Sequence, residues 1–218
     1  MADLPPPPAW LPRPEELGRF FGGSALYPFY RLKLFEYIGR LLPAEGPCSV
    51  LDIGAGDGSL GAALEVFRPC TRVFGLEVSV RAATRPGFRL ARFDGRALPL
   101  ADGTVDVALL SNVLHHAANP LALLLEARRV ARRTIVKDHL ARGKIDRLKL
   151  TALDVLGNLR LGAQVSATYL AQDAWDGLFR ALPRTHVAAH HGLAFRRGPL
   201  ERIFENGLEV IFALDATA

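Results

Sequence analysis

Residues 49–58 constrain the fold more than any other segment of the chain. The short apolar run Ser49-Val-Leu-Asp-Ile53 has the composition of a strand and leads directly into Gly54-Ala-Gly-Asp-Gly58. Three alternate glycines let the backbone turn tightly and let a ligand approach with no Cβ in the way. The helix predicted from Ser59 to about Phe67 presents free N–H groups at its start. This strand–turn–helix unit predicts a parallel α/β sheet with a ligand site at the end of its first strand.

Strand and helix patterns alternate along the rest of the chain. Further strands are predicted at Arg72–Glu77, Phe88–Phe93, Val105–Ser111, Thr134–Lys137, His186–Phe195 and Leu208–Leu214. Further helices are predicted from Asn119-Pro120 to about Ala131, from Ile145 to about Leu159 and from Gln172 to about Leu182. This alternation is typical of a Rossmann-like, doubly wound α/β fold with a seven-stranded, mostly parallel sheet. The last two strands have no helical return between them, which predicts an antiparallel edge strand.

The first 42 residues differ from the rest of the chain. Residues 1–14 contain six prolines and predict an extended arm, and apolar side chains at helical spacing predict helices from Pro14 to Leu42. We therefore predict a proline-rich arm and helical cap at 1–42 and a ligand-binding sheet domain at 43–218. The part of the cap from Phe20 to Tyr30 is expected to close over the site as a lid. The alternative is that its aromatic side chains are core residues.

Composition and charge exclude several classes of protein. Hydrophobic residues make up 50% and charged residues 22%, which excludes a disordered or fibrous chain. No apolar run is long enough to span a bilayer, and the N-terminus lacks the pattern of a signal peptide. Cys48 and Cys70 form no CxxC pair and are expected to be reduced core residues of a cytoplasmic protein. Residues 121–218 carry the whole net charge of +5 without a stripe of aromatics, which favours a solvated helix end over nucleic-acid binding.

Acidic residues stand at the ends of the predicted strands. Asp52 and Asp57 bracket the glycine turn, and Glu77 ends the second strand, where a carboxylate can accept both hydroxyls of a ribose. Residues 56–61 formally match the dinucleotide pattern G-x-G-x-x-G. Carboxylates at both ends of the turn would repel a pyrophosphate but would hold a sulfonium cation that carries an ammonium group. Asp94, at the end of the third strand, can accept from an adenine amino group.

Taken in order, these motifs resemble the class I S-adenosylmethionine-dependent methyltransferases, and among them the small-molecule branch called methyltransferase type 11. The resemblance runs from about Val50 to Asp138, roughly two fifths of the chain, and includes the block from Leu98 to His116. It implies S-adenosylmethionine as the cofactor. It also implies cofactor-binding residues at four strand ends: Asp52, Gly54, Ala55, Gly56, Glu77, Val78, Asp94, Gly95, Ser111 and Asn112.

The histidines after the fourth strand are the first candidates for catalysis. A base is required only if the methyl acceptor keeps its proton, and an imidazole can serve near neutral pH. We predict His116 and His115 as catalytic residues, with Asp138 after the fifth strand as a third. The alternative is that a histidine here caps the helix or walls the cofactor.

Aromatic residues in the helical segments are the candidates for contact with the acceptor. They are Phe21, Tyr27, Tyr30, Tyr169 and Trp175, and core packing is the alternative for each. Asp154 and Asn158 share a helical face at i,i+4, where they either reach the cleft or cap a loop. No metal site is predicted, because His186 and His190 on one strand would lie about 13 Å apart, too far for one zinc ion.

The expected function is methyl transfer to a small, apolar or aromatic acceptor by in-line displacement. Two alternatives stay open: an S-adenosylmethionine-binding partner protein without catalysis, and a nicotinamide-dependent oxidoreductase. After the fourth strand the chain has Ser111-Asn112-Val113-Leu114 instead of the Asp/Asn-Pro-Pro-aromatic motif of several DNA and RNA methyltransferases. Amino methylation of nucleic-acid bases is therefore not favoured.

Overall fold

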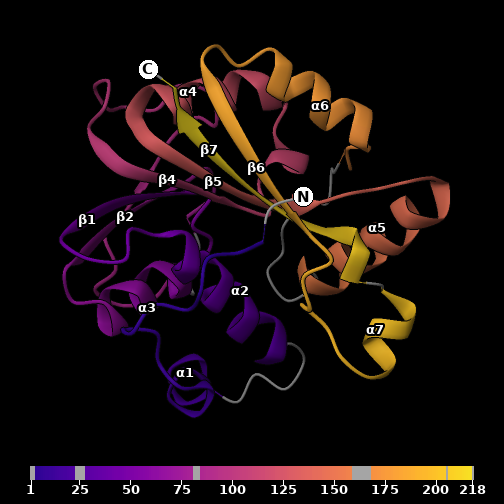
Figure 1. The fold of residues 1–218 in the computed structure, drawn as a ribbon, viewed down its shortest axis with the longest axis horizontal. Helices are drawn as coiled ribbons and strands as arrows, with labels where there is room; N and C mark the ends of the chain where they lie inside the picture. Colours follow the sequence, from indigo (N-terminus) through magenta and orange to yellow (C-terminus); the bar gives the residue numbers. More distant parts are fainter. Residues whose placement is uncertain (1–2, 23–27, 81–83, 159–167, 205, 218) are drawn as a thin grey trace.

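A twisted mixed sheet forms the centre of the molecule in the computed structural model (Figure 1). The structure describes residues 3–22, 28–80, 84–158, 168–204 and 206–217. Within these ranges the sheet has seven strands in the order β3-β2-β1-β4-β5-β7-β6. Their bounds are β1 Cys48–Ile53, β2 Thr71–Glu77, β3 Leu90–Arg92, β4 Val105–Ser111, β5 Ala131–His139, β6 Thr185–His191 and β7 Glu209–Ala216.

The strand pairing confirms the predicted doubly wound, Rossmann-like fold. β1 pairs in parallel with β2 and β4, and β4 pairs in parallel with β5. β7 runs antiparallel to both β5 and β6, so the antiparallel strand lies one place in from the edge and not at the edge. The described residues of the connection from β6 to β7 include the short helix α7 Pro199–Ile203 and a 3-10 turn. This connection returns the chain antiparallel, beside its own predecessor.

Helices cover both faces of the sheet. Their remaining bounds are α1 Pro14–Phe21, α2 Pro28–Leu41, α3 Ser59–Phe67, α4 Pro120–Val130, α5 Lys144–Asn158 and α6 Gln172–Arg180. Successive strand residues point to opposite faces, so Val50 packs in the cluster with α1, α2 and α3, and Leu51 packs in the cluster with α4 and α6. The two groups of helices lie on opposite sides of the strands in Figure 1.

Most predicted elements begin and end within a few residues of the observed ones. α3 and β4 have the predicted bounds, whereas β5 is five residues longer because β4 and β7 pair with it on both sides. The third strand is shorter than predicted, as expected for an edge strand with one neighbour. Cys48 is buried as expected, but Cys70 is exposed, because it lies in the turn between α3 and β2 and not in the core.

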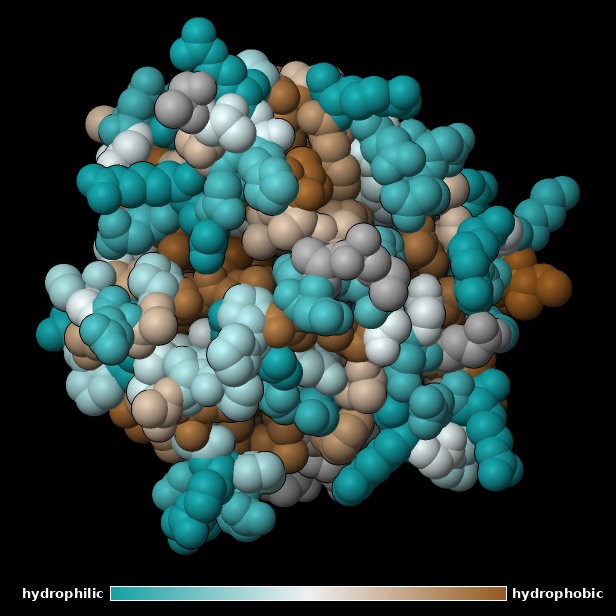
Figure 2. Space-filling view, viewed as in Figure 1, coloured by the Kyte–Doolittle hydropathy of each residue, from teal (hydrophilic) through white to brown (hydrophobic). Residues whose placement is uncertain are grey.

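The N-terminal helices share a core with the sheet. Phe35 of α2 is fully buried, and its ring makes edge contacts with Trp10, Phe21 and Phe67. The predicted division of the chain at residue 42 stays a prediction. Hydrophilic side chains cover the outer parts of the face drawn in Figure 2, with hydrophobic ones between them nearer its centre. No helix in the described ranges is both long enough and apolar enough to cross a bilayer.

We expect Phe35→Ala to lower the free energy of unfolding by about 3–5 kcal/mol, because it leaves a cavity between three aromatic rings. Urea denaturation followed by circular dichroism measures this change. Val66→Ala is the control, since Val66 is 57% exposed and a substitution there should cost no more than about 0.5 kcal/mol. An unchanged midpoint in Phe35→Ala would show that the cap does not stabilise the sheet.

Candidate active site

The glycine turn connects the end of β1 to α3 and leaves room beside its backbone. Gly54, Gly56 and Gly58 have φ values of 73°, 59° and 74°, which favour glycine over residues with a side chain. A Cβ on Gly54 would lie 2.5 Å from Val113 Cγ2, whereas a Cβ on Gly56 would meet no described atom within 4 Å. Gly54 therefore permits close packing inside the fold, and Gly56 keeps an open surface beside the turn.

Glu77 at the end of β2 holds this turn in place. Its Oε2 accepts a hydrogen bond from the backbone N–H of Gly56 at 2.8 Å, and its Oε1 accepts one from the N–H of Val78 at 2.9 Å. A carboxylate that accepts from backbone N–H groups keeps further lone pairs for other donors. Glu77 is therefore oriented by the chain and still able to accept hydrogen bonds from a ligand.

Asp52 lies directly before the turn and is buried without a neutralising partner. It is 2% exposed, and its Oδ2 has no hydrogen-bond partner among the described residues. Burial, followed by the negative charges of Glu77 and Asp57, raises the pKa of Asp52 to about 7. A cation placed beside Asp52 would favour its charged form. The structure thus fits a positively charged group at this end of β1.

Val78, Asp94 and Gly95, predicted to bind adenine, lie together outside the main cavity. Val78 is 46% exposed, and a Cβ on Gly95 would lie 3.2 Å from Val78 Cγ2. Asp94 Oδ1 accepts from the backbone N–H groups of Arg96 and Ala97, and these bonds lower its pKa. The structure therefore brings these three residues to one surface at the ends of β2 and β3, which leaves their role in binding a prediction.

A cavity of about 390 Å³ lies beside the glycine turn and extends to the ends of β4 and β5. Asp52, Gly54, Ala55, Gly56, Ser111 and Asn112 line it, as the predicted cofactor site requires. Side chains from the cap and from the second half of the chain complete the wall: Phe21, Tyr30, Arg31, Leu34, His139, Leu153, Asp154 and Arg196. One continuous space therefore connects the predicted cofactor-binding turn with a second wall of mixed apolar and polar side chains.

Asn112 forms the corner between these two parts of the cavity. It has a φ of 58°, in the left-handed region that asparagine tolerates better than most residues. Its backbone N–H donates to the carbonyl of Lys137 at 2.8 Å, and its Nδ2 donates to the Tyr30 hydroxyl at 3.0 Å. The end of β4 is thus tied to β5 and to the cap.

Three charged side chains behind Asn112 form a group that the sequence analysis missed. Lys137 and Glu209 are fully buried and paired, and Arg196 forms a second ion pair with Glu209. Burial alone would lower the pKa of Lys137, but attraction to Glu209 outweighs it and raises that pKa. The one available signal was a lysine inside the apolar strand Ile135-Val136-Lys137, because such a residue needs a buried partner.

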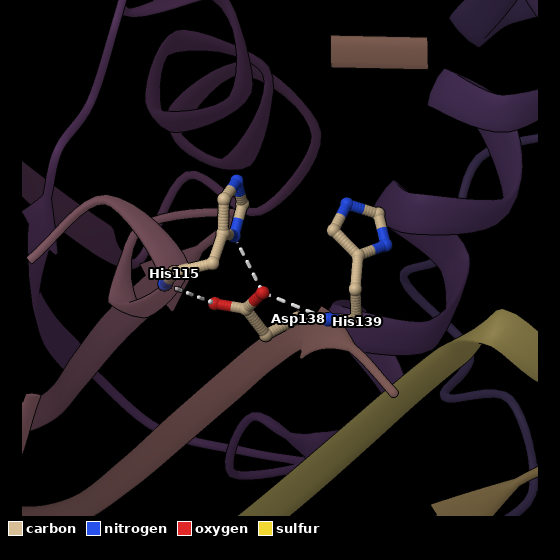
Figure 3. A group of neighbouring side chains, drawn as sticks. All are labelled: His115, Asp138 and His139. Atoms are coloured by element: carbon tan, nitrogen blue, oxygen red, sulfur yellow. Dashed lines mark hydrogen bonds and ion pairs between the residues drawn. The ribbon is translucent and has the colours of Figure 1, made fainter. Parts of the chain in front are cut away.

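The predicted catalytic residues His115 and Asp138 form a buried pair (Figure 3). His115 Nδ1 lies 2.6 Å from Asp138 Oδ1, and Asp138 also accepts from the backbone N–H groups of Leu114 and His139. Burial would raise the pKa of Asp138, but His115 lowers it to about 2. Burial lowers the pKa of the neighbouring His139. The pair is therefore an ionised carboxylate that orients the His115 ring.

His116 and Tyr169 complete this cluster together with Asp154 of α5. His116 Nε2 lies 3.5 Å from Asp154 Oδ2, and the Tyr169 hydroxyl donates to Asp154 Oδ2 at 3.2 Å. The Tyr169 ring stacks on His115 with ring centres 5.2 Å apart. Asp154 lines the cavity. Of the two alternatives for this helical face, the structure therefore favours the one in which Asp154 reaches the cleft.

The structure places the residues predicted to contact the acceptor in different environments. Phe21 and Tyr30 line the cavity, and Tyr169 reaches it indirectly through Asp154. Tyr27 lies outside the described residues. Trp175 is a correction: it is 1% exposed, does not line the cavity, and packs against Phe179 and Phe212 in the core. The physical reason is that this side chain points into the core cluster beside the sheet, where its Nε1 donates to the carbonyl of His139.

Comparison with known proteins agrees with this geometry. A family model described as a methyltransferase domain, Methyltransf_11, matches residues 51–134. This segment is therefore similar to the methyltransferase domains of the type 11 family. An uncharacterized methyltransferase from Mycobacterium sp. (strain KMS) is 40% identical over 92 residues, covering 40% of this chain and 36% of that protein. The chain spans between about a quarter and a third of the length of the curated relatives it matches.

Solved structures share the fold of this chain over nearly all of its length. The methyltransferase in a complex with the Haloferax volcanii Trm112 methyltransferase activator superposes with a TM-score of 0.66 at 17% identity, covering 96% of this chain and 97% of that one. A SAM-dependent methyltransferase from Thermotoga maritima has a TM-score of 0.59 at 21% identity, covering 93% and 96%. The family implies S-adenosylmethionine as the cofactor, and the open surface at Gly56 and the unpartnered Asp52 fit its cationic end.

We expect Asp52→Asn to be more stable than the wild type at pH 8, and the difference to disappear below pH 4. In the unfolded chain the pKa of Asp52 returns to its ordinary 3.8, so between these pH values the unfolded chain binds fewer protons than the folded one. The wild-type free energy of unfolding therefore falls as the pH rises from 4 to 7. A shift of about three units corresponds to about 4 kcal/mol.

Urea denaturation at several pH values tests this expectation. Asp173→Asn, at an exposed position of α6, is the control and should keep the wild-type pH dependence. The same pH dependence in Asp52→Asn and in the wild type would contradict the assignment of an elevated pKa to Asp52.

Proposed function

We propose that this methyltransferase transfers a methyl group from S-adenosylmethionine to a small molecule bound in the cavity. The observation that carries the proposal is the continuity of that cavity, from the glycine turn to the second wall of side chains. A site for methyl transfer must hold the cofactor and the acceptor side by side, because the reaction is an in-line displacement. Bound S-adenosylmethionine supplies an electrophilic methyl group on a positively charged sulfur.

The chain's own residues divide the work of binding. Asp52 offers a negative charge to the sulfonium and ammonium groups, and Gly54 and Gly56 let the backbone approach the ligand. Glu77 offers acceptor oxygens to the ribose hydroxyls. Val78 and Asp94 extend this surface toward the adenine. These assignments agree with the positions of the residues at adjoining strand ends.

The second wall supports an acceptor with an apolar or aromatic body and a polar group. Phe21, Tyr30 and Leu34 offer apolar and aromatic surface, while Asn112, His139, Asp154 and Arg196 offer hydrogen bonds and charge. Holding the acceptor in line with the methyl group can supply up to about 7–11 kcal/mol of the barrier. His115, His116 and Asp138 border this wall through His139 and Asp154, and their proposed role is to activate an acceptor that keeps its proton.

We expect S-adenosylmethionine and S-adenosylhomocysteine to bind with micromolar dissociation constants and NAD not to bind. Titration calorimetry on the full chain measures all three. Glu77→Gln removes the charge of the ribose acceptor at nearly constant size, and should weaken binding by about 1.5–3 kcal/mol. Glu45→Gln, at an exposed position, should not change the affinity. Binding of NAD alone would favour the nicotinamide-dependent oxidoreductase over the methyltransferase.

We expect Phe21→Ala to lower the rate of turnover, measured as formation of S-adenosylhomocysteine, on the order of tenfold. The reason is that the acceptor is held less precisely. Its affinity for S-adenosylmethionine should stay close to that of the wild type. Phe74→Ala is the control, since Phe74 is exposed on β2 away from the cavity. A point variant is used because a truncation of the cap would also remove the buried Leu17. Unchanged turnover in Phe21→Ala across a panel of acceptors would show that Phe21 of the cap does not contact the acceptor.

A second proposal is a cofactor-binding protein that needs, or serves as, a partner subunit. The methyltransferase of similar fold solved with the Trm112 activator is the observation that keeps it open. Turnover by the purified chain alone, with any acceptor, would exclude a catalytically silent role. Tight cofactor binding without turnover until a second protein is added would favour it.

A further inference from the structure

Three side chains beside the cavity bring two imidazoles and a carboxylate together. They are His115 and His116 of the 3-10 turn Leu114–His116, and Asp154 of α5. One donor atom from each lies within 4.8 Å of the other two, and His116 Nε2 is 3.5 Å from Asp154 Oδ2. Ligands of a tetrahedral zinc ion, with bonds near 2.0–2.1 Å, lie about 3.4 Å apart. The donor atoms are thus close to the spacing that a metal ion requires.

His115 is oriented in the way that metal-binding histidines usually are. Its Nδ1 hydrogen bonds to Asp138 at 2.6 Å, which places the proton on Nδ1 and leaves the lone pair on Nε2. Figure 3 shows the second ring nitrogen pointing away from the carboxylate. Nε2 is buried and has no hydrogen-bond partner among the described residues. Metal-binding histidines commonly donate their other N–H to a carboxylate in this way.

Tyr169 contacts two of the three residues, Asp154 and His115. Its hydroxyl donates to Asp154 and its ring stacks on His115, so one side chain fixes both the carboxylate and an imidazole. Asp138 and Asp154 are carboxylates that each lie beside a histidine, Asp138 beside His115 and Asp154 beside His116. Two carboxylates among imidazoles attract a divalent cation, and nitrogen donors favour transition metals over magnesium or calcium.

A second group of donors, His115, Asp138 and His139, lies equally close together but is already engaged. Asp138 is paired with His115, and His139 Nδ1 faces Glu209 Oε2 at 3.2 Å. An ion there would break the bond that orients His115. An ion between His115, His116 and Asp154 leaves that bond intact and uses it.

We propose that His115, His116 and Asp154 bind a divalent transition-metal ion such as Zn²⁺. Asp154 lines the cavity, so an ion bound to it would adjoin the acceptor wall, and the exposed His116 would give the ion a path of entry. The ion would hold an oxygen of the acceptor and acidify a bound hydroxyl. That role rests on the proposed methyl transfer, whereas the binding of the ion does not. The sequence analysis predicted no metal site, because only the fold joins residues 116 and 154.

The test measures binding of the metal alone, without cofactor or acceptor. The full chain, stripped with a chelator, is titrated with Zn²⁺ in competition with a chromophoric chelator, and with Co²⁺ by visible absorption. We expect one ion per chain, with Co²⁺ absorption typical of four- or five-coordinate sites. His116→Ala and Asp154→Asn should each weaken Zn²⁺ binding by more than about a hundredfold. Asp138→Asn changes the group that orients His115 and should weaken binding by about ten- to a hundredfold.

His186→Ala is the matched control, because His186 is an exposed histidine on β6 outside the cluster. It should bind Zn²⁺ as the wild type does. A wild type that binds no stoichiometric Zn²⁺ would overturn the proposal and would leave His116 and Asp154 as an ordinary ion pair. Unchanged affinity in folded His116→Ala and Asp154→Asn would overturn it as well. The wild-type titration needs no variant, so it tests the proposal even if a variant fails to fold. Stoichiometric metal binding without methyl transfer would contradict the proposed function and leave the metal site standing. Methyl transfer without metal binding would contradict the metal site alone.

Discussion

The parallel register of β1, β4 and β5 is the constraint on which the site depends. Ile53 pairs with Leu110, and Ser111 pairs with Lys137, so three strands end at one edge of the sheet. The chain must leave this edge at once without burying unpaired backbone groups. It does so through the glycine turn after β1 and through the left-handed Asn112 after β4, whose N–H bonds to the carbonyl of Lys137. Side chains far apart in sequence are thereby brought to one cavity.

The parts of the site that follow a strand directly could be predicted from the sequence. Asp52, Gly54 and Asn112 come within two residues of an apolar run, and the ends of parallel strands meet at one edge. Contacts that depend on a distant element could not be found this way. Glu209 lies on β7, which enters the sheet antiparallel beside β5 and carries this carboxylate to Lys137. Asp154 reaches His116 only because α5 packs beside the end of β5.

Aromatic residues show a second limit of sequence reasoning. Phe21 and Trp175 both lie on short amphipathic helices, and their local patterns predict neither cavity nor core. Trp175 is buried in the core cluster beside the sheet, where its Nε1 donates to the carbonyl of His139 at 3.1 Å. Phe21 is the last residue of α1 and borders the cavity. Tertiary packing decides whether such a ring lies in the core or beside the cavity, and the periodicity of the sequence contains no information about that packing.

Charged residues line both ends of the cavity, and under the proposed function they set the direction in which the ligands lie. Asp52 and Asp57 face the space beside the glycine turn, where Arg31 lies 4.0 Å from Asp57. Arg196 and the buried Lys137 stand on the other side of Asn112 with Glu209 between them. Opposite charges interact strongly where water is excluded. The proposed cofactor would therefore place its cationic groups beside Asp52 and its ribose beside Glu77. The acceptor would lie against His139 and Asp154, where an activating group has to act.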